Sequence, residues 1–205
     1  METTVSTTRA GWGRRTKALL AGGLVLGVGA AITLAAWNDS EFASGIFNAG
    51  SFDMVGSTDG AVFANHPDGA PAALVFSTGF NNLSPDTTVA APFVLHLTPT
   101  TTFDADVVLE SAVGTGTAEA NITYGIQQVA DFAACTPTAT GVEIVAAGTP
   151  LDSAVGADAF ALLQSVDGTA PGADVFLCFQ VSAGSALAQG TGAVGTWEFV
   201  ATSTE

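Results

Sequence analysis

From residue 50 onward, apolar side chains recur at every second position in short runs that are separated by turn signals. A period of two places alternate side chains on opposite faces of a strand. Three aspartate–glycine pairs typical of tight turns, Asp59-Gly60, Asp68-Gly69 and Asp167-Gly168, lie between such runs. The pattern predicts strands over Leu74–Phe80, Val89–Leu97, Ala105–Val113, Ala120–Val129, Val142–Ala147, Asp174–Val181 and Val194–Thr202. Short strands at this spacing predict an all-β fold, an antiparallel β-sandwich.

The alternation also assigns side chains to strand faces. One face of the Val89–Leu97 run carries Phe93, Leu95 and Leu97, and the opposite face carries Val94, His96 and Thr98. On that opposite face we expect His96 to be a solvated side chain. One segment, Leu151–Gln164, departs from the strand pattern and is the single helix candidate of this region, although Gly156 interrupts it.

Charged side chains are segregated along the chain. The four basic residues, Arg9, Arg14, Arg15 and Lys17, all precede residue 18, whereas only Glu2 of the 19 acidic residues lies there. Residues 36–205 therefore carry 18 acids and no Lys or Arg. This region cannot neutralise phosphates, which argues against nucleic acid or anionic lipid as a partner. Its folded state must depend on apolar burial and backbone hydrogen bonds, because Lys/Arg salt bridges cannot form.

The basic N-terminus precedes a long apolar run. Residues 18–36 carry no charge, and Thr33 is the one polar side chain among them. A small-x-small pattern ending at Ala35 predicts cleavage between Ala35 and Ala36, and the basic flank predicts export of the region beyond the apolar run. A retained membrane anchor is the alternative, since roughly 20 apolar residues span a bilayer. The predicted organisation is a signal peptide over 1–35, a mature N-terminal segment over 36–55 and a β-sandwich domain over 56–205.

Three short motifs come directly after the predicted cleavage site. They are Ala36-Trp37-Asn38-Asp39, Phe42-Ala43-Ser44-Gly45 and Gly50-Ser51-Phe52-Asp53. Together with the apolar run before them, these motifs resemble the SipW-type signal peptides of the TasA/camelysin family, over residues 14 to 54. The resemblance implies export, removal of the leader by a SipW-like signal peptidase, and a β-sandwich of jelly-roll type. In some members of that family, the N-terminal segment of one subunit completes the sheet of the next within an extracellular fibre.

The segment after the predicted cut is itself rich in large apolar residues. Its predicted assembly residues are Trp37, Phe42, Ile46, Phe47 and Phe52, and Gly45 and Gly50 make a stable helix unfavourable. Such a segment can add to the sheet edge of a second copy, and a contact of this kind that does not close gives a filament. The alternative is that Phe42–Val55 is simply the first strand of its own sandwich.

Two cysteines, Cys135 and Cys178, are present. An even pair in an exported chain predicts a disulfide. Cys178 lies on the strand face opposite Val175, Leu177 and Phe179, and Cys135 lies in a polar connection. Two separate buried thiols are the alternative.

Motifs for catalysis or metal binding are missing from the sequence. His66 and His96 are 30 residues apart, and neither H-E-x-x-H nor G-x-S-x-G occurs. Asp104, Asp106 and Glu110 offer oxygen ligands for Ca²⁺, but their spacing matches no calcium loop and favours a solvated strand edge. We therefore predict no catalytic residue, no cofactor and no metal ligand.

These features together predict a secreted, self-associating structural protein of the cell surface or extracellular matrix. A fibre subunit that assembles by strand addition is one form that such a protein can take. The first alternative is a monomeric exported binding module for cations or glycans. The second is a metallopeptidase of camelysin type. Membrane contact is expected only through an uncleaved signal segment.

Overall fold

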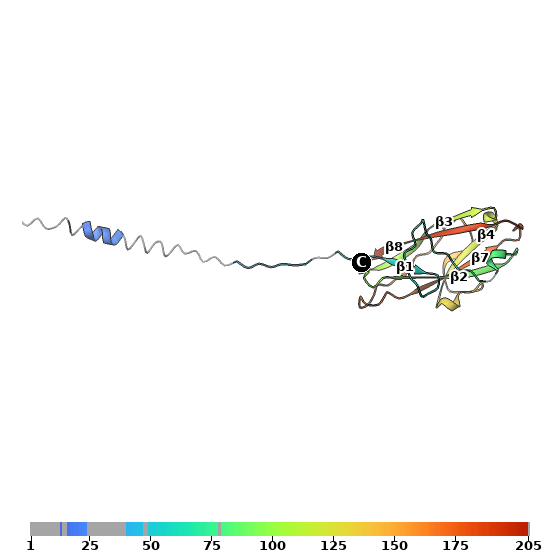
Figure 1. The fold of residues 1–205 in the computed structure, drawn as a ribbon, viewed down its shortest axis with the longest axis horizontal. Coiled ribbons are helices and arrows are strands. Elements are labelled where there is room, and N and C mark those ends of the chain that lie inside the picture. Colours follow the sequence, from blue (N-terminus) through green and yellow to red (C-terminus); the bar gives the residue numbers. More distant parts are fainter. Residues whose placement is uncertain (1–12, 14–15, 24–39, 47–48, 78, 205) are drawn as a thin grey trace, which may run out of the picture. The chain divides into compact units, whose positions relative to one another are not determined.

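The computed structural model describes residues 13, 16–23, 40–46, 49–77 and 79–204, and the chain divides into two compact units, 1–47 and 48–205. In the first unit, residues 16–23 are helical (Figure 1). The predicted cleavage residues Ala35 and Ala36, together with Trp37 and Phe47, lie outside the described residues. Among the residues that are described, none of the helices has both the length and the apolar character to cross a membrane.

The second unit is a β-sandwich of two antiparallel sheets (Figure 1). Its strands are β1 (Met54–Ser57), β2 (Thr88–Leu97), β3 (Asp104–Gly116), β4 (Ile122–Val129), β5 (Val142–Pro150), β6 (Phe160–Leu162), β7 (Val175–Ala183) and β8 (Ala193–Thr204). Three short 3-10 turns complete it, η1 (Phe80–Asn82), η2 (Glu119–Asn121) and η3 (Phe132–Ala134). The first sheet has the order β1-β2-β7-β4-β5 and the second has the order β6-β3-β8. The predicted all-β fold of this region is confirmed.

The core lies between the two sheets. Tyr124 and Phe179 of the five-stranded sheet are 1% exposed, and they face Trp197 and Phe199 of β8. The ring centroid of Trp197 is 5.4 Å from that of Tyr124 and 5.0 Å from that of Phe179. Burial raises the pKa of Tyr124 to about 12, and its hydroxyl donates a hydrogen bond of 2.6 Å to the Ser153 carbonyl.

The outer face of the five-stranded sheet carries a second, smaller apolar cluster. Ala90, Val129 and Cys178 are buried there beneath the connection that comes after β4. Cys178 forms a disulfide with Cys135, as the sequence predicts, and the Gln180 side chain donates hydrogen bonds of 3.2 and 3.0 Å to the carbonyls of Thr136 and Ala139. Cys178 therefore fastens this connection over the sheet.

Two predicted elements are wrong. Residues 74–77 form no strand. Leu74 and Phe76 pack on the core and Val75 is 65% exposed, and the Ser77 N–H donates a hydrogen bond of 2.7 Å to the Ala90 carbonyl of β2. The side chains alternate between buried and exposed as in a strand, but the backbone does not form the ladder of hydrogen bonds that defines one.

The predicted helix Leu151–Gln164 is instead a set of turns that leads into β6. Gly156 adopts a φ of 79°, which a helix does not tolerate. Phe160 and Leu162 are buried on either side of the exposed Ala161, and this period of two pairs them with β3.

The structure assigns part of the predicted N-terminal segment to the sandwich itself. Met54–Ser57 pairs with β2, and Ser51 forms a bridge with Thr101. Phe52, which is 40% exposed, lies within this paired stretch. Residues 51–57 therefore belong to their own domain, and a strand available to another molecule must come from residues before Ser51.

Breaking the disulfide is expected to destabilise this domain by about 4 kcal/mol, because on the chain-entropy model the bond closes a loop of 43 residues in the unfolded state. Denaturant unfolding of the oxidised protein and of the Cys135→Ser/Cys178→Ala variant measures the difference. An unchanged unfolding midpoint would contradict the fastening role of the bond.

Candidate functional site

The outer edge of β8 is the main candidate for an interaction site. β8 pairs with β3 along its whole length, from Asp104 opposite Thr204 to Gly116 opposite Ala193, with one register shift. Its other edge has no strand neighbour, and no backbone hydrogen bond reaches it from any loop of the described residues. The backbone N–H and C=O groups of an edge of this kind can pair with an added strand.

The local sequence explains why β8 is a regular strand. It is rich in β-branched and aromatic residues, which favour extended structure. Trp197, Phe199 and Ala201 point into the core, and Val194 and Val200 are exposed on the outer face at 64% and 40%. The strand contains neither proline nor lysine, which are the residues that commonly protect an edge from pairing.

The other sheet edges are protected. β1 is four residues long, and its Gly56 exchanges two backbone hydrogen bonds of 3.0 Å with Ala64 on the outer side. β6 has three residues. β5 is bulged against β4, ends at Pro150, and has its Ile144 carbonyl occupied by the Asp158 N–H at 2.8 Å. Within the part of the chain that the structure describes, β8 is the longest edge strand. β3 also has no strand neighbour there on its β6 side beyond Val107, but only for the remainder of its length.

One buried polar atom also lies on β8. Among the described residues, Trp197 Nε1 is the buried side-chain nitrogen that lacks a hydrogen-bond partner. Buried polar groups are nearly always paired, so an unpaired one calls for a cause. The Trp197 side chain nevertheless lies beside the Tyr124 hydroxyl, where it offsets part of the effect of burial on the Tyr124 pKa. This nitrogen therefore belongs to the core between the sheets and not to the outer edge of β8.

His96 does not lie in solvent as predicted. It is 6% exposed, its ring stacks on Phe63 with centroids 4.0 Å apart, and its Nδ1 is 2.7 Å from Asp174 Oδ1. Strand alternation placed His96 correctly on the outer face, but the loop that contains Phe63 covers that face. The contacts tie this loop and the start of β7 to β2, so His96 has a structural role.

The remaining candidate ligands are not assembled into a site. His66 is exposed, with its ring centroid 6.4 Å from that of Phe93. Asp104 accepts a hydrogen bond of 2.7 Å from the Gln164 N–H, while Asp106 comes two residues later on the same strand. No group of three His, Cys, Asp or Glu side chains is placed to hold a metal ion within the described ranges.

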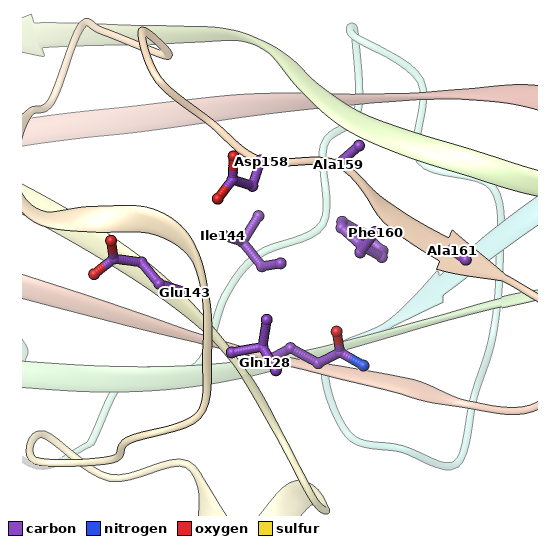
Figure 2. Close-up of a pocket in the computed structure, with 8 residues that line it drawn as sticks. Gln128, Glu143, Ile144, Asp158, Ala159, Phe160 and Ala161 are labelled. Atoms are coloured by element: carbon purple, nitrogen blue, oxygen red, sulfur yellow. The ribbon is translucent and has the colours of Figure 1, made fainter.

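An open groove lies where β5 approaches the segment before β6 (Figure 2). It has a volume of about 520 Å³. Its lining consists of Gln128, Val142, Glu143, Ile144, Asp158, Ala159, Phe160 and Ala161. Figure 2 shows the carboxylates of Glu143 and Asp158 beside the apolar side chains of Ile144 and Phe160. The groove combines two acidic side chains with buried apolar ones.

Two loops share the motif Ser-x-Asp-Gly and the same hydrogen-bonding pattern. In Ser57–Gly60, Asp59 accepts from the backbone N–H groups of Ala61 and Val62 at 2.8 and 2.9 Å. These donors lower the pKa of Asp59 from 3.8 to about 2, because they stabilise the charged carboxylate. Each glycine has a φ of 70°, which the turn requires.

Asp167, in the second of these loops, accepts from the Thr169 N–H at 2.9 Å and from the Ala170 N–H at 3.3 Å. The Thr169 backbone is the largest cause of a pKa lowered from 3.8 to about 2. Local hydrogen bonds therefore fix both loops. They lie at two of the positions where Asp-Gly pairs in the sequence predict turns.

Neither a scan against models of known protein families nor a search of curated proteins found a match to this chain.

Both aspartates are expected to titrate with midpoints near pH 2, and carboxyl NMR across pH 1 to 6 would measure this. Since their pKa values are lowered on folding, the stabilisation they give is complete above about pH 4 and is lost as the pH falls towards 2. The same groups in the urea-unfolded chain, with midpoints near 3.9, are the control. Midpoints near 3.9 in the folded protein would contradict the loop geometry.

Proposed function

We propose that this protein is a secreted structural protein of the cell surface or extracellular matrix, whose copies associate by adding a strand to the outer edge of β8. The observation that carries the proposal is the contrast between edge strands. Among the described residues, β8 has twelve residues, a single charged side chain and no strand or loop bonded to its outer edge, whereas β1, β5 and β6 are short, bulged or covered. An exposed edge of that length is normally selected against in a monomer.

The strand pairings support a jelly roll in which one position is vacant. A jelly roll folds a long antiparallel hairpin so that strands pair 2 with 7, 3 with 6, 4 with 5 and 1 with 8. Here β2 pairs with β7, β3 with β6 and β4 with β5. The remaining position, beside β8, is not filled by β1, because β1 pairs with β2. An added strand at β8 would complete this arrangement.

The segment before Ser51 of a second copy is the occupant that we favour. Phe42 and Ile46 are 96% and 90% exposed, and four residues apart they share one face of a strand. On that face they would reach the partly exposed core beside Trp197 and Phe199. Burying each such side chain contributes about 2 kcal/mol.

Strand direction explains why the occupant should come from another molecule. Ser51 is bridged to Thr101, close to where β3 begins opposite the C-terminal end of β8. If the preceding residues of the same molecule lay along β8, they would run in the same direction as β8 and form a parallel pair. A second molecule can instead supply the antiparallel partner that the jelly-roll pairing requires.

The N-terminal sequence supplies a means of control. The basic and apolar leader and the motifs that resemble SipW-type signal peptides support export and cleavage after Ala35. Cleavage would free the segment from the membrane and so start assembly outside the cell. The Cys135–Cys178 disulfide is compatible with an oxidising extracellular environment.

Replacing the apolar residues of the segment is expected to prevent assembly. After leader removal, the wild-type protein should sediment as a polymer, and the variant with Phe42→Ser, Ile46→Ser and Phe47→Ser should stay monomeric, because the added strand would no longer bury apolar surface. Sedimentation velocity and electron microscopy of the same samples measure this. N-terminal sequencing of the wild-type sample establishes that the leader has been removed.

The matched control removes three exposed valines elsewhere. Val62, Val155 and Val166 are exposed at 69%, 86% and 104%, and the variant with serine at all three should assemble like the wild type. Equal assembly of both triple variants, or a wild-type protein that remains monomeric after cleavage, would contradict the proposal.

Assembly should also depend on ionic conditions. Eighteen acidic side chains without basic partners repel those of neighbouring copies, so added NaCl, millimolar divalent cations or mild acid should promote polymer growth. Light scattering at increasing salt measures the effect. If Ca²⁺ raises the unfolding temperature without increasing scattering, the alternative of a monomeric binding module is favoured instead.

A further inference from the structure

We propose that Glu198 keeps β8 from pairing with the β8 strand of a second copy, and so reserves this edge for an uncharged segment. The inference concerns the same edge as the proposed function and rests on it. Glu198 is the one charged residue of β8, lies near the middle of its twelve residues, and is exposed on the outer face. It is the single feature of the strand that resembles edge protection.

A free and regular edge strand has an obvious competing partner, which is itself. Two copies of β8 in antiparallel pairing are related by a twofold axis perpendicular to the sheet, so residues on the same face stand opposite each other. Two registers give the greatest overlap. In the first, Glu198 of one copy lies opposite Glu198 of the other. In the second, each Glu198 lies opposite Val200, and the two glutamates are diagonal neighbours. The Cβ atoms of directly opposite residues are about 5 Å apart and those of diagonal residues about 7 to 8 Å. Both registers bring two carboxylates together.

The surroundings offer nothing that would relieve this repulsion. Residues 36–205 contain no Lys or Arg, so no cation of the chain can be placed between the two carboxylates. Ser111 Oγ donates a hydrogen bond of 2.9 Å to Glu198 Oε2 across the β3–β8 pair. This contact holds the carboxylate on the outer face of the sheet, on the β3 side of β8, and it leaves the charge of Glu198 uncompensated.

The proposed occupant avoids the same penalty. Residues 42–50 carry no charged side chain, and the nearest acids on either side are Glu41 and Asp53. A strand formed by this stretch can therefore lie beside Glu198 without placing a like charge opposite it. Repulsion between the two Glu198 carboxylates therefore disfavours the closed β8–β8 dimer relative to addition of the N-terminal segment. The closed dimer would end growth, so this repulsion gives specificity.

The test uses Glu198→Gln in the full-length chain that also carries Phe42→Ser, Ile46→Ser and Phe47→Ser, so that strand addition does not compete. Glutamine retains an oxygen that can accept the Ser111 hydrogen bond, and the fold should be unchanged by circular dichroism and unfolding midpoint. We expect dimerisation to strengthen by up to about fivefold in sedimentation equilibrium, since like charges opposite each other cost up to about 1 kcal/mol. Amide exchange should slow along residues 193–204.

Glu143→Gln in the same triple-serine background is the matched control, because it removes the same charge from an exposed site on β5. This variant should dimerise no more than its parent. The difference between the two variants should shrink in high salt, which screens the repulsion in the parent.

Equal dimerisation of the two variants, or a dimer in which the amides of β8 are not protected, would overturn the assignment. Either outcome leaves the proposed function intact, because strand addition is tested with Glu198 in place. Conversely, if the wild-type chain fails to assemble while Glu198→Gln forms a β8-protected dimer, the proposed function fails and the role of Glu198 stands.

Discussion

The contact of two β8 side chains, Trp197 and Phe199, with Phe179 and Tyr124 holds the three-stranded sheet against the five-stranded sheet. Buried aliphatic side chains from both sheets complete the same core. Residues 36–205 lack Lys and Arg, and the contact of 2.7 Å between His96 Nδ1 and Asp174 Oδ1 lies on the outer face of the larger sheet. Burial of a large apolar side chain contributes about 1.5–3 kcal/mol, so a few aromatic rings between the sheets can supply what charge pairs cannot.

This dependence on β8 has a structural consequence. Its aromatic side chains and its pairing with β3 fix the strand in position, but they use only one face and one edge. The five-stranded sheet differs, because its outer face is covered. One cover is the connection that the Cys135–Cys178 disulfide fastens, and the other is the loop around Phe63. Protection is therefore concentrated on one sheet. β8 is a regular strand with one edge free of strand neighbours among the described residues, and such a rigid edge suits recognition of an extended segment at low entropic cost.

The acidic surface acts on association in two ways. Over the whole molecule, repulsion among acidic side chains opposes any approach of two copies and makes association sensitive to salt. At β8, a single carboxylate, that of Glu198, acts locally and only against partners that bring a like charge to the same place. In the proposed assembly, the first effect would set how strongly copies associate, and the second would set which strands pair. The two can be separated because a local charge change leaves the net charge of the molecule nearly unaltered.

The sequence by itself determined those features that depend on near neighbours along the chain. Side-chain alternation located most strands, aspartate–glycine pairs located turns, and the face of Cys178 could be assigned from its neighbours on β7. The tertiary structure decided what depends on distant contacts: residues 74–77 alternate like a strand yet lack a ladder, and His96 is buried because Phe63 covers it. The free edge of β8 belongs to this second kind. Its partner residues lie far off in sequence, as Ser111 and Glu198 do at a separation of 87, and no local pattern records which side of a strand is left unpaired.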